Sequence, residues 1–121
     1  MKALVGANFI ADTTSTTFVN LGQTRVIFTQ ATAGCVIVRF SAEAGNTGAG
    51  VMLVRAILDG VDVALPSQVS FAFNDNFGTA RSYEFIFPNV APGSHSVRMQ
   101  FHSGDGPTVF VNNRTTTVLY K

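Results

Sequence analysis

The chain has 121 residues, of which 46% are hydrophobic and 12% are charged, and its formal net charge is +1. This length suits one domain and is too short for two ordinary ones, so residues 1–121 are expected to form a single domain. The high apolar content excludes a disordered chain, and the lack of a basic stripe argues against nucleic-acid binding.

The cysteine content and the lengths of the apolar runs exclude further classes of protein. The single cysteine, Cys35, allows neither an intrachain disulfide nor a cysteine metal cluster. The apolar runs are far shorter than the roughly 20 residues of a membrane helix, so no membrane insertion is expected. Polar Asn8 and Asp12 follow the N-terminal residues too soon for a signal-peptide core. The chain is therefore either cytoplasmic when made or trimmed of a leader.

Strand-favouring Phe, Val and Thr dominate the sequence, and no stretch of ten residues keeps a helical period. Turn-forming Gly, Asn, Asp and Pro recur at intervals of about 8–12 residues, which is typical of a sandwich or barrel. The expected strands are residues 3–10, 16–20, 23–30, 35–43, 50–58, 61–64, 67–73, 80–87, 94–102 and 107–120. The last is expected in two pieces, broken near Asn112 and Asn113.

Alternation of apolar and polar residues predicts which side chains of each strand face the core. The inward residues expected in this way are Val97, Met99 and Phe101 in 94–102, Tyr83, Phe85 and Phe87 in 80–87, and Val69, Phe71 and Phe73 in 67–73.

Two strands, 35–43 and 50–58, are largely apolar on both faces. A two-layer sandwich buries only one face of each sheet, so the second face needs a cover. Either a loop of the same chain or another subunit could supply it, and the low charge content favours a subunit.

The sequence contains no pattern that predicts catalysis. Its two histidines, His95 and His102, lie seven residues apart and so on opposite faces of one strand. Its two glutamates, Glu43 and Glu84, are far apart in sequence, and Cys35 begins an apolar strand where a thiol is normally inert. We therefore expect no enzyme, no catalytic residue, no metal and no cofactor.

Three arginines, Arg39, Arg55 and Arg98, interrupt strand faces. Such arginines contact either an anion or sugar, or a carboxylate or partner subunit at the sheet surface. Glu84 lies in the middle of a strand and is expected to form a cross-strand ion pair with one of the three.

The segment Asn74-Asp75-Asn76-Phe77 is the candidate ligand site, with Arg81 beside it. Amide and carboxylate groups next to an aromatic ring suit a sugar, because a sugar offers hydroxyls on its rim and an apolar face. The segment lacks the spaced acids of a calcium loop. Its alternative is a plain turn held by Asx hydrogen bonds.

The length, the near-complete strand content and the number of expected strands resemble those of the jelly-roll family that includes tumour necrosis factor and complement C1q-like domains. Three segments carry the resemblance: GCVIVRF at 34–40, VRAILDG at 54–60 and PGSHSVR at 92–98. The resemblance implies a jelly-roll β-sandwich of about ten antiparallel strands that assembles as a homotrimer, with bacterial lectin-like proteins among the relatives.

These observations predict a non-enzymatic, oligomeric binding module, with a trimer favoured and a carbohydrate as its ligand. Rigid sheets would present the loops, and several subunits would multiply weak single-site affinity. The alternative is a structural building block of a virion, fibre or particle surface. The compartment stays unknown, although both readings favour an extracellular or particle surface.

Overall fold

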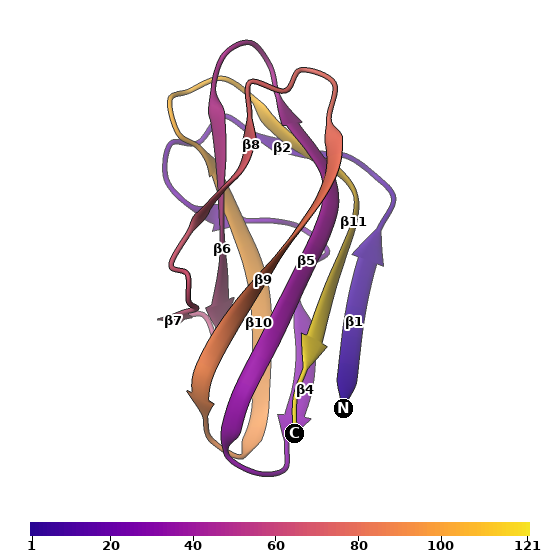
Figure 1. Cartoon of the computed structure of the whole chain (residues 1–121), viewed down its shortest axis with the longest axis vertical. Coiled ribbons are helices and arrows are strands. Elements are labelled where there is room, and N and C mark those ends of the chain that lie inside the picture. Colours follow the sequence, from indigo (N-terminus) through magenta and orange to yellow (C-terminus); the bar gives the residue numbers. More distant parts are fainter.

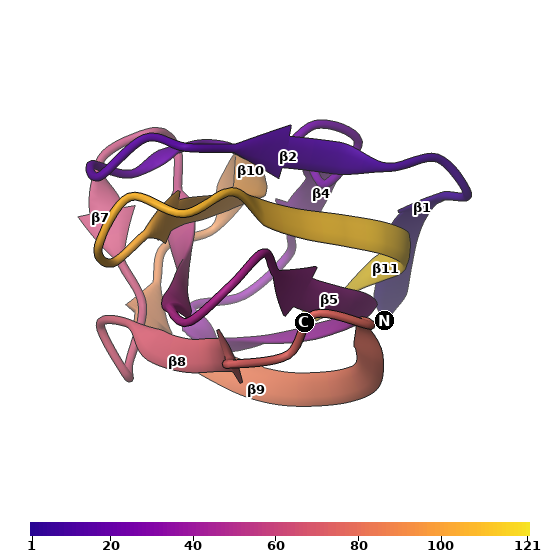
Figure 2. The same ribbon diagram turned by 90° about the horizontal axis from the view of Figure 1, so that it is seen from above.

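The chain folds into two antiparallel sheets that pack face to face, as a computed structural model of all residues 1–121 shows (Figures 1 and 2). The first sheet contains, in spatial order, β1 (Lys2–Ala7), β11 (Val109–Leu119), β5 (Gly34–Asn46) and β9 (Thr79–Val90), with β2 (Ala11–Thr13) also on β11. The structure contains no helix of the length and apolarity that crossing a membrane requires.

The second sheet is built around two long strands, β10 (Gly93–Ser103) and β6 (Val51–Leu58). Each of these long strands pairs, along its other edge, with two short strands. The edge of β10 carries β3 (Val19–Asn20) and β4 (Val26–Gln30), and the edge of β6 carries β7 (Asp62–Val63) and β8 (Val69–Phe73). These eleven strands confirm the predicted all-β jelly-roll sandwich.

Several expected strand boundaries differ from the structure by up to three residues, and two of the differences have a clear physical cause. The segment 3–10 ends as a strand at Ala7, and β2 then continues along the same edge of β11. The predicted break in 107–120 is instead an irregularity within one strand. The pairing of β11 with β5 shifts between Asn112 and Thr115, where Asn113 has a φ of 32°. A bulge thus absorbs the turn-forming residues without ending the strand.

The core lies between the sheets and follows the predicted alternation on β10, where Val97, Met99 and Phe101 are all buried. On β9, Phe85 and Phe87 are buried as predicted. The exposed Tyr83 corrects the prediction: it lies on the same face as Phe85, but β9 is an edge strand and leaves 44% of this residue uncovered.

The prediction for β8 is wrong at its end, because Phe73 is 67% exposed. The pairing of β6 with β8 shifts between Met52 and Leu53. This shift places the neighbouring residues Phe71 and Ala72 both in the core. A bulge reverses the alternation of every residue beyond it, so Phe73 points outward.

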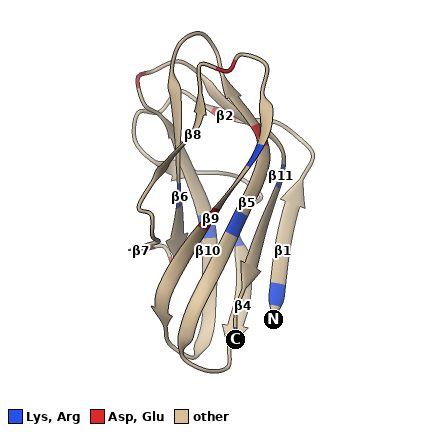
Figure 3. Cartoon of the chain, in the orientation of Figure 1, with Lys and Arg blue, Asp and Glu red and all other residues tan.

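The predicted cross-strand ion pair of Glu84 is confirmed, and its partner is Arg39. The two residues are opposite each other on β9 and β5, with Arg39 Nη2 2.9 Å from Glu84 Oε2. Both side chains are half exposed, so the pair contributes at most about 1 kcal/mol to stability. Figure 3 shows that charged residues are few and are spread over strands of both sheets and over the loops.

Candidate functional site

The predicted site segment is the loop between β8 and β9, at one end of the sandwich (Figure 1). It is tied to the loop between β5 and β6. Asn46 N donates to Asp75 O at 2.7 Å, and Gly50 N donates to Asn74 Oδ1 at 2.8 Å. The amide of Asn74 therefore holds two loops together.

The carboxylate of Asp75 is filled by donors of its own loop. Its Oδ1 accepts from the backbone N–H groups of Phe77 and Gly78 at 3.1 Å each. Its Oδ2 accepts from Thr79 Oγ1 at 2.6 Å and from Arg81 Nη2 at 2.5 Å. The hydrogen bond from Thr79, followed by the two N–H groups and the charge of Arg81, lowers the pKa of Asp75 against the opposing effect of burial. Asp75 and Arg81 thus shape the loop.

Two of the five predicted residues remain free to meet a ligand. The Asn76 side chain is exposed and forms no hydrogen bond, and Phe77 is 95% exposed. Arg81 is further committed by a 2.8 Å hydrogen bond to Phe71 O. The loop therefore has the Asx turn expected of its alternative reading, while its tip offers an amide and an aromatic ring.

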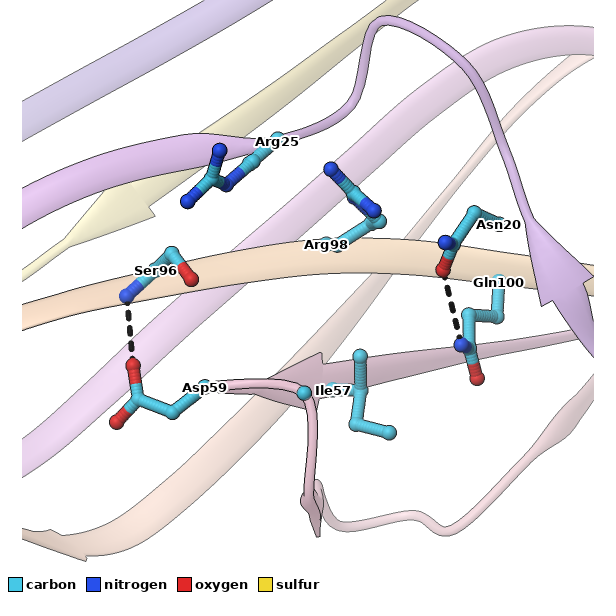
Figure 4. A pocket seen from close by; sticks show the side chains of 8 residues that line it. Asn20, Arg25, Ile57, Asp59, Ser96, Arg98 and Gln100 are labelled. Carbon is cyan, nitrogen blue, oxygen red and sulfur yellow. Dashed lines mark hydrogen bonds between the residues drawn. The ribbon is translucent and has the colours of Figure 1, made fainter.

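The main concave feature is a polar hollow of about 500 Å³ on the outer face of the second sheet (Figure 4). It lies over β10, where the neighbouring edge changes from β3 to β4. There Leu21 N donates to Met99 O, and Thr24 Oγ1 accepts from Met99 N. The lining residues are Asn20, Arg25, Ile57, Asp59, Gly60, Ser96, Arg98 and Gln100.

One wall of the hollow is a relay of side-chain hydrogen bonds. Arg55 Nε donates to Gln100 Oε1 at 2.9 Å, and Gln100 Nε2 donates to Asn20 Oδ1 at 3.0 Å. The guanidinium of Arg55 also stacks 4.2 Å from the ring centre of Phe18. The relay fixes the Asn20 side chain and leaves its amide nitrogen without a partner in the chain.

The opposite wall contains Asp59, the only acid that lines the hollow. Its Oδ1 accepts from Ser96 N at 2.8 Å, and its Oδ2 lies 2.7 Å from His95 Nδ1. The other ring nitrogen of His95 donates to Ala91 O at 2.8 Å.

Hydrogen bonding couples the ionisation of Asp59 and His95. The hydrogen bond to Asp59 outweighs burial and raises the pKa of His95. Burial raises the pKa of Asp59, but the hydrogen bonds from His95 and Ser96 prevail and lower it. Both shifts favour an ionised pair, in which the imidazolium balances the carboxylate.

Sequence reasoning found only Arg98 among the residues of the hollow. The alternating polar residues Ser96, Arg98 and Gln100 of β10 were a usable signal, because they mark one solvated strand face. Asn20, Arg25 and Asp59 come from other parts of the chain, so only the strand pairing brings them there. No cluster of three metal-ligating side chains is present.

Comparisons with known proteins identify the fold. No protein-family model matches the sequence, and a search of curated proteins finds no match. Among solved structures, a family 35 carbohydrate-binding module from Clostridium thermocellum is similar at a TM-score of 0.54 and 14% identity, covering 100% of this chain and 99% of that one. A family 35 carbohydrate-binding module from an environmental isolate has a TM-score of 0.53 and 15% identity, and the match covers 94% of this chain and 83% of that one. Dimeric latent PorU from Porphyromonas gingivalis has a TM-score of 0.56 and 12% identity, and the match covers 97% of this chain and 12% of that one.

Proposed function

We propose that the chain is a non-enzymatic carbohydrate-binding module whose ligand lies in the hollow over β10. The observation that carries the proposal is the hollow itself, in which guanidinium, amide and hydroxyl groups converge beside the side chain of Ile57. A few placed polar groups around a recess are typical of small-molecule sites. The two carbohydrate-binding modules that share the fold support the proposal.

The hollow is prepared for binding before a ligand arrives. Its side chains project from paired strands, and the relay from Arg55 through Gln100 to Asn20 holds one wall in place. Binding a ligand would therefore cost little conformational entropy in the side chains of the site, which favours high affinity.

A glycan screen followed by titration calorimetry tests the proposal. We expect Asn20→Ala to weaken binding of the best glycan by roughly five- to tenfold, the value of one hydrogen bond. The matched variant is Phe77→Ala on the distant loop, and both variants should keep the wild-type circular dichroism spectrum. The hollow is the wrong site if Asn20→Ala binds as wild type does.

The loop tip of Asn76 and Phe77 is the second candidate surface for the same function. The exposed ring of Phe77 suits stacking against a sugar, and the free amide of Asn76 lies next to it in sequence. Loss of binding in Phe77→Ala with retention in Asn20→Ala would move the site to this loop.

We also propose that the chain assembles as a homo-oligomer of the tumour necrosis factor and C1q type, with a trimer favoured. The supporting observation is an apolar row on the outer face of the first sheet, where Leu119, Ile37, Ile86 and Leu65 are successive partners across the strands. Ile86 is 37% and Leu65 is 56% exposed. Light scattering should give a molar mass near three chains, whereas a mass of one chain contradicts the proposal.

Assembly through this apolar row could serve either of two functions. In an oligomeric binding module, several copies would raise the avidity for a repeating glycan. A structural building block of a virion, fibre or particle surface would instead form large ordered assemblies, which electron microscopy would show.

A further inference from the structure

We propose that the hollow over β10 selects a sugar that carries an oxyanion, either a uronate carboxylate or a sulfate ester. This inference rests on the proposed carbohydrate-binding function and specifies the chemistry of its ligand. Its basis is the pair Arg25 and Arg98, which line the hollow together (Figure 4).

Arg25 and Arg98 are the two arginines whose side chains form no hydrogen bond or ion pair in the fold. The other four arginines are engaged: Arg39 with Glu84, Arg55 with Gln100, Arg81 with Asp75, and Arg114 with two backbone carbonyls. The unpartnered guanidinium groups therefore occur in one place, and that place is the hollow.

The strand register brings the positive charges of Arg25 and Arg98 together, and their repulsion lowers the stability of the fold. Arg25 directly precedes β4, whose first residue Val26 pairs with Val97, so the antiparallel register continued by one residue sets Arg25 opposite Arg98. Like charges at opposite positions on neighbouring strands are destabilising. An oxyanion between the two guanidinium groups would remove this repulsion, because each group can donate two parallel hydrogen bonds to it.

No acid of the chain supplies that oxyanion. Asp59 is the only acid at the hollow, and its two oxygens are occupied by Ser96 N and by His95. Both ring nitrogens of His95 face acceptors, Asp59 Oδ2 and Ala91 O, which favours the protonated ring as the partner of this carboxylate. The two arginines consequently face the hollow without a neutralising partner.

The unused groups of the hollow are mainly donors. They are the guanidinium groups of Arg25 and Arg98, the amide nitrogen of Asn20 and the hydroxyl of Ser96. The side-chain oxygens of Asn20 and Gln100 each accept one hydrogen bond and keep one further lone pair, so the free donors outnumber the free acceptors. A neutral sugar hydroxyl needs both donors and acceptors, whereas a carboxylate or sulfate only accepts. The hollow therefore fits an anionic sugar better than a neutral one.

Calorimetry on the full chain tests the inference with three matched probes: a galacturonate trisaccharide, a sulfated galactose trisaccharide and neutral galactotriose. We expect an anionic probe to bind at least about tenfold more tightly than the neutral one. Raising salt from about 50 to about 500 mM should reduce that preference, because exposed charges are screened.

Arg25→Gln and Arg98→Gln should each weaken the anionic probe by at least about tenfold and the neutral probe by less than about twofold. Arg39→Gln removes the same charge from the other sheet and should change neither by more than about twofold. Arg25 is exposed, so its variant keeps the test valid if Arg98→Gln fails to fold.

The outcomes separate the two proposals. Preference for the carboxylate or for the sulfate supports the inference and identifies the source of the oxyanion. Equal binding of neutral and anionic probes, or an anionic preference that survives Arg25→Gln, overturns the inference and leaves carbohydrate binding intact. Failure of every glycan in the screen to bind overturns the proposed function itself.

Discussion

Phe85→Ala is expected to lower the free energy of unfolding by about 3–5 kcal/mol, the cost of truncating a buried phenylalanine. Phe85 is fully buried on β9 and faces the second sheet across the core. Removing its ring deletes the transfer free energy of the side chain and leaves a cavity between the two sheets. Urea denaturation followed by circular dichroism measures the loss.

The matched control for this prediction is Phe77→Ala. Phe77 is 95% exposed, so its truncation should change stability by less than about 0.5 kcal/mol. A loss below about 1 kcal/mol for Phe85→Ala would mean that the assignment of the inner face of β9 is wrong.

Arg114→Ala is expected to destabilise the fold by about 2–4 kcal/mol, through lost hydrogen bonds and a cavity. Arg114 projects from β11 and is 1% exposed. Its Nε donates to Gly22 O and its Nη1 donates to Phe9 O, both at 2.8 Å, and its guanidinium lies 5.0 Å from the Phe9 ring centre. Burial lowers the pKa of Arg114.

Arg114 therefore joins three distant segments of the chain. Its loss should speed amide exchange in residues 8–10 and 20–23 before the rest of the sandwich, which hydrogen exchange can resolve. Arg39→Ala is the control, because its ion pair with Glu84 is half exposed and contributes no more than about 1 kcal/mol. Equal losses of stability in Arg114→Ala and Arg39→Ala would contradict the conclusion that Arg114 joins these segments.

Local patterns were sufficient for much of the fold. The alternation in 94–102 correctly placed Val97, Met99 and Phe101 inside, because successive side chains of a strand point to opposite faces. The same rule failed at Phe73, since a bulge shifts the alternation and depends on pairing with β6. The apolar second face of 50–58 was also visible, and part of its cover comes from the same chain, through Phe18 stacked on Arg55.

The candidate loop was correctly recognised as polar and exposed at its tip. Its sequence did not reveal that Asp75 is already satisfied by four donors, two of them backbone N–H groups of the same turn. Such a network depends on the backbone conformation of the loop and on its contact with the β5–β6 loop. Whether a carboxylate is free to bind a ligand is thus a property of the folded loop.

The sequence was sufficient to predict the all-β class, the approximate places of the turns and the inner face of most strands, because strand periodicity and turn chemistry are local. The tertiary structure alone decided which polar groups meet. Antiparallel pairing brings residue 20, residue 25 and residues 57–60 around β10, and it leaves Arg25 and Arg98 at one hollow with no ion pair to an acid. Electrostatic partners are chosen by long-range register, and no local pattern encodes that register.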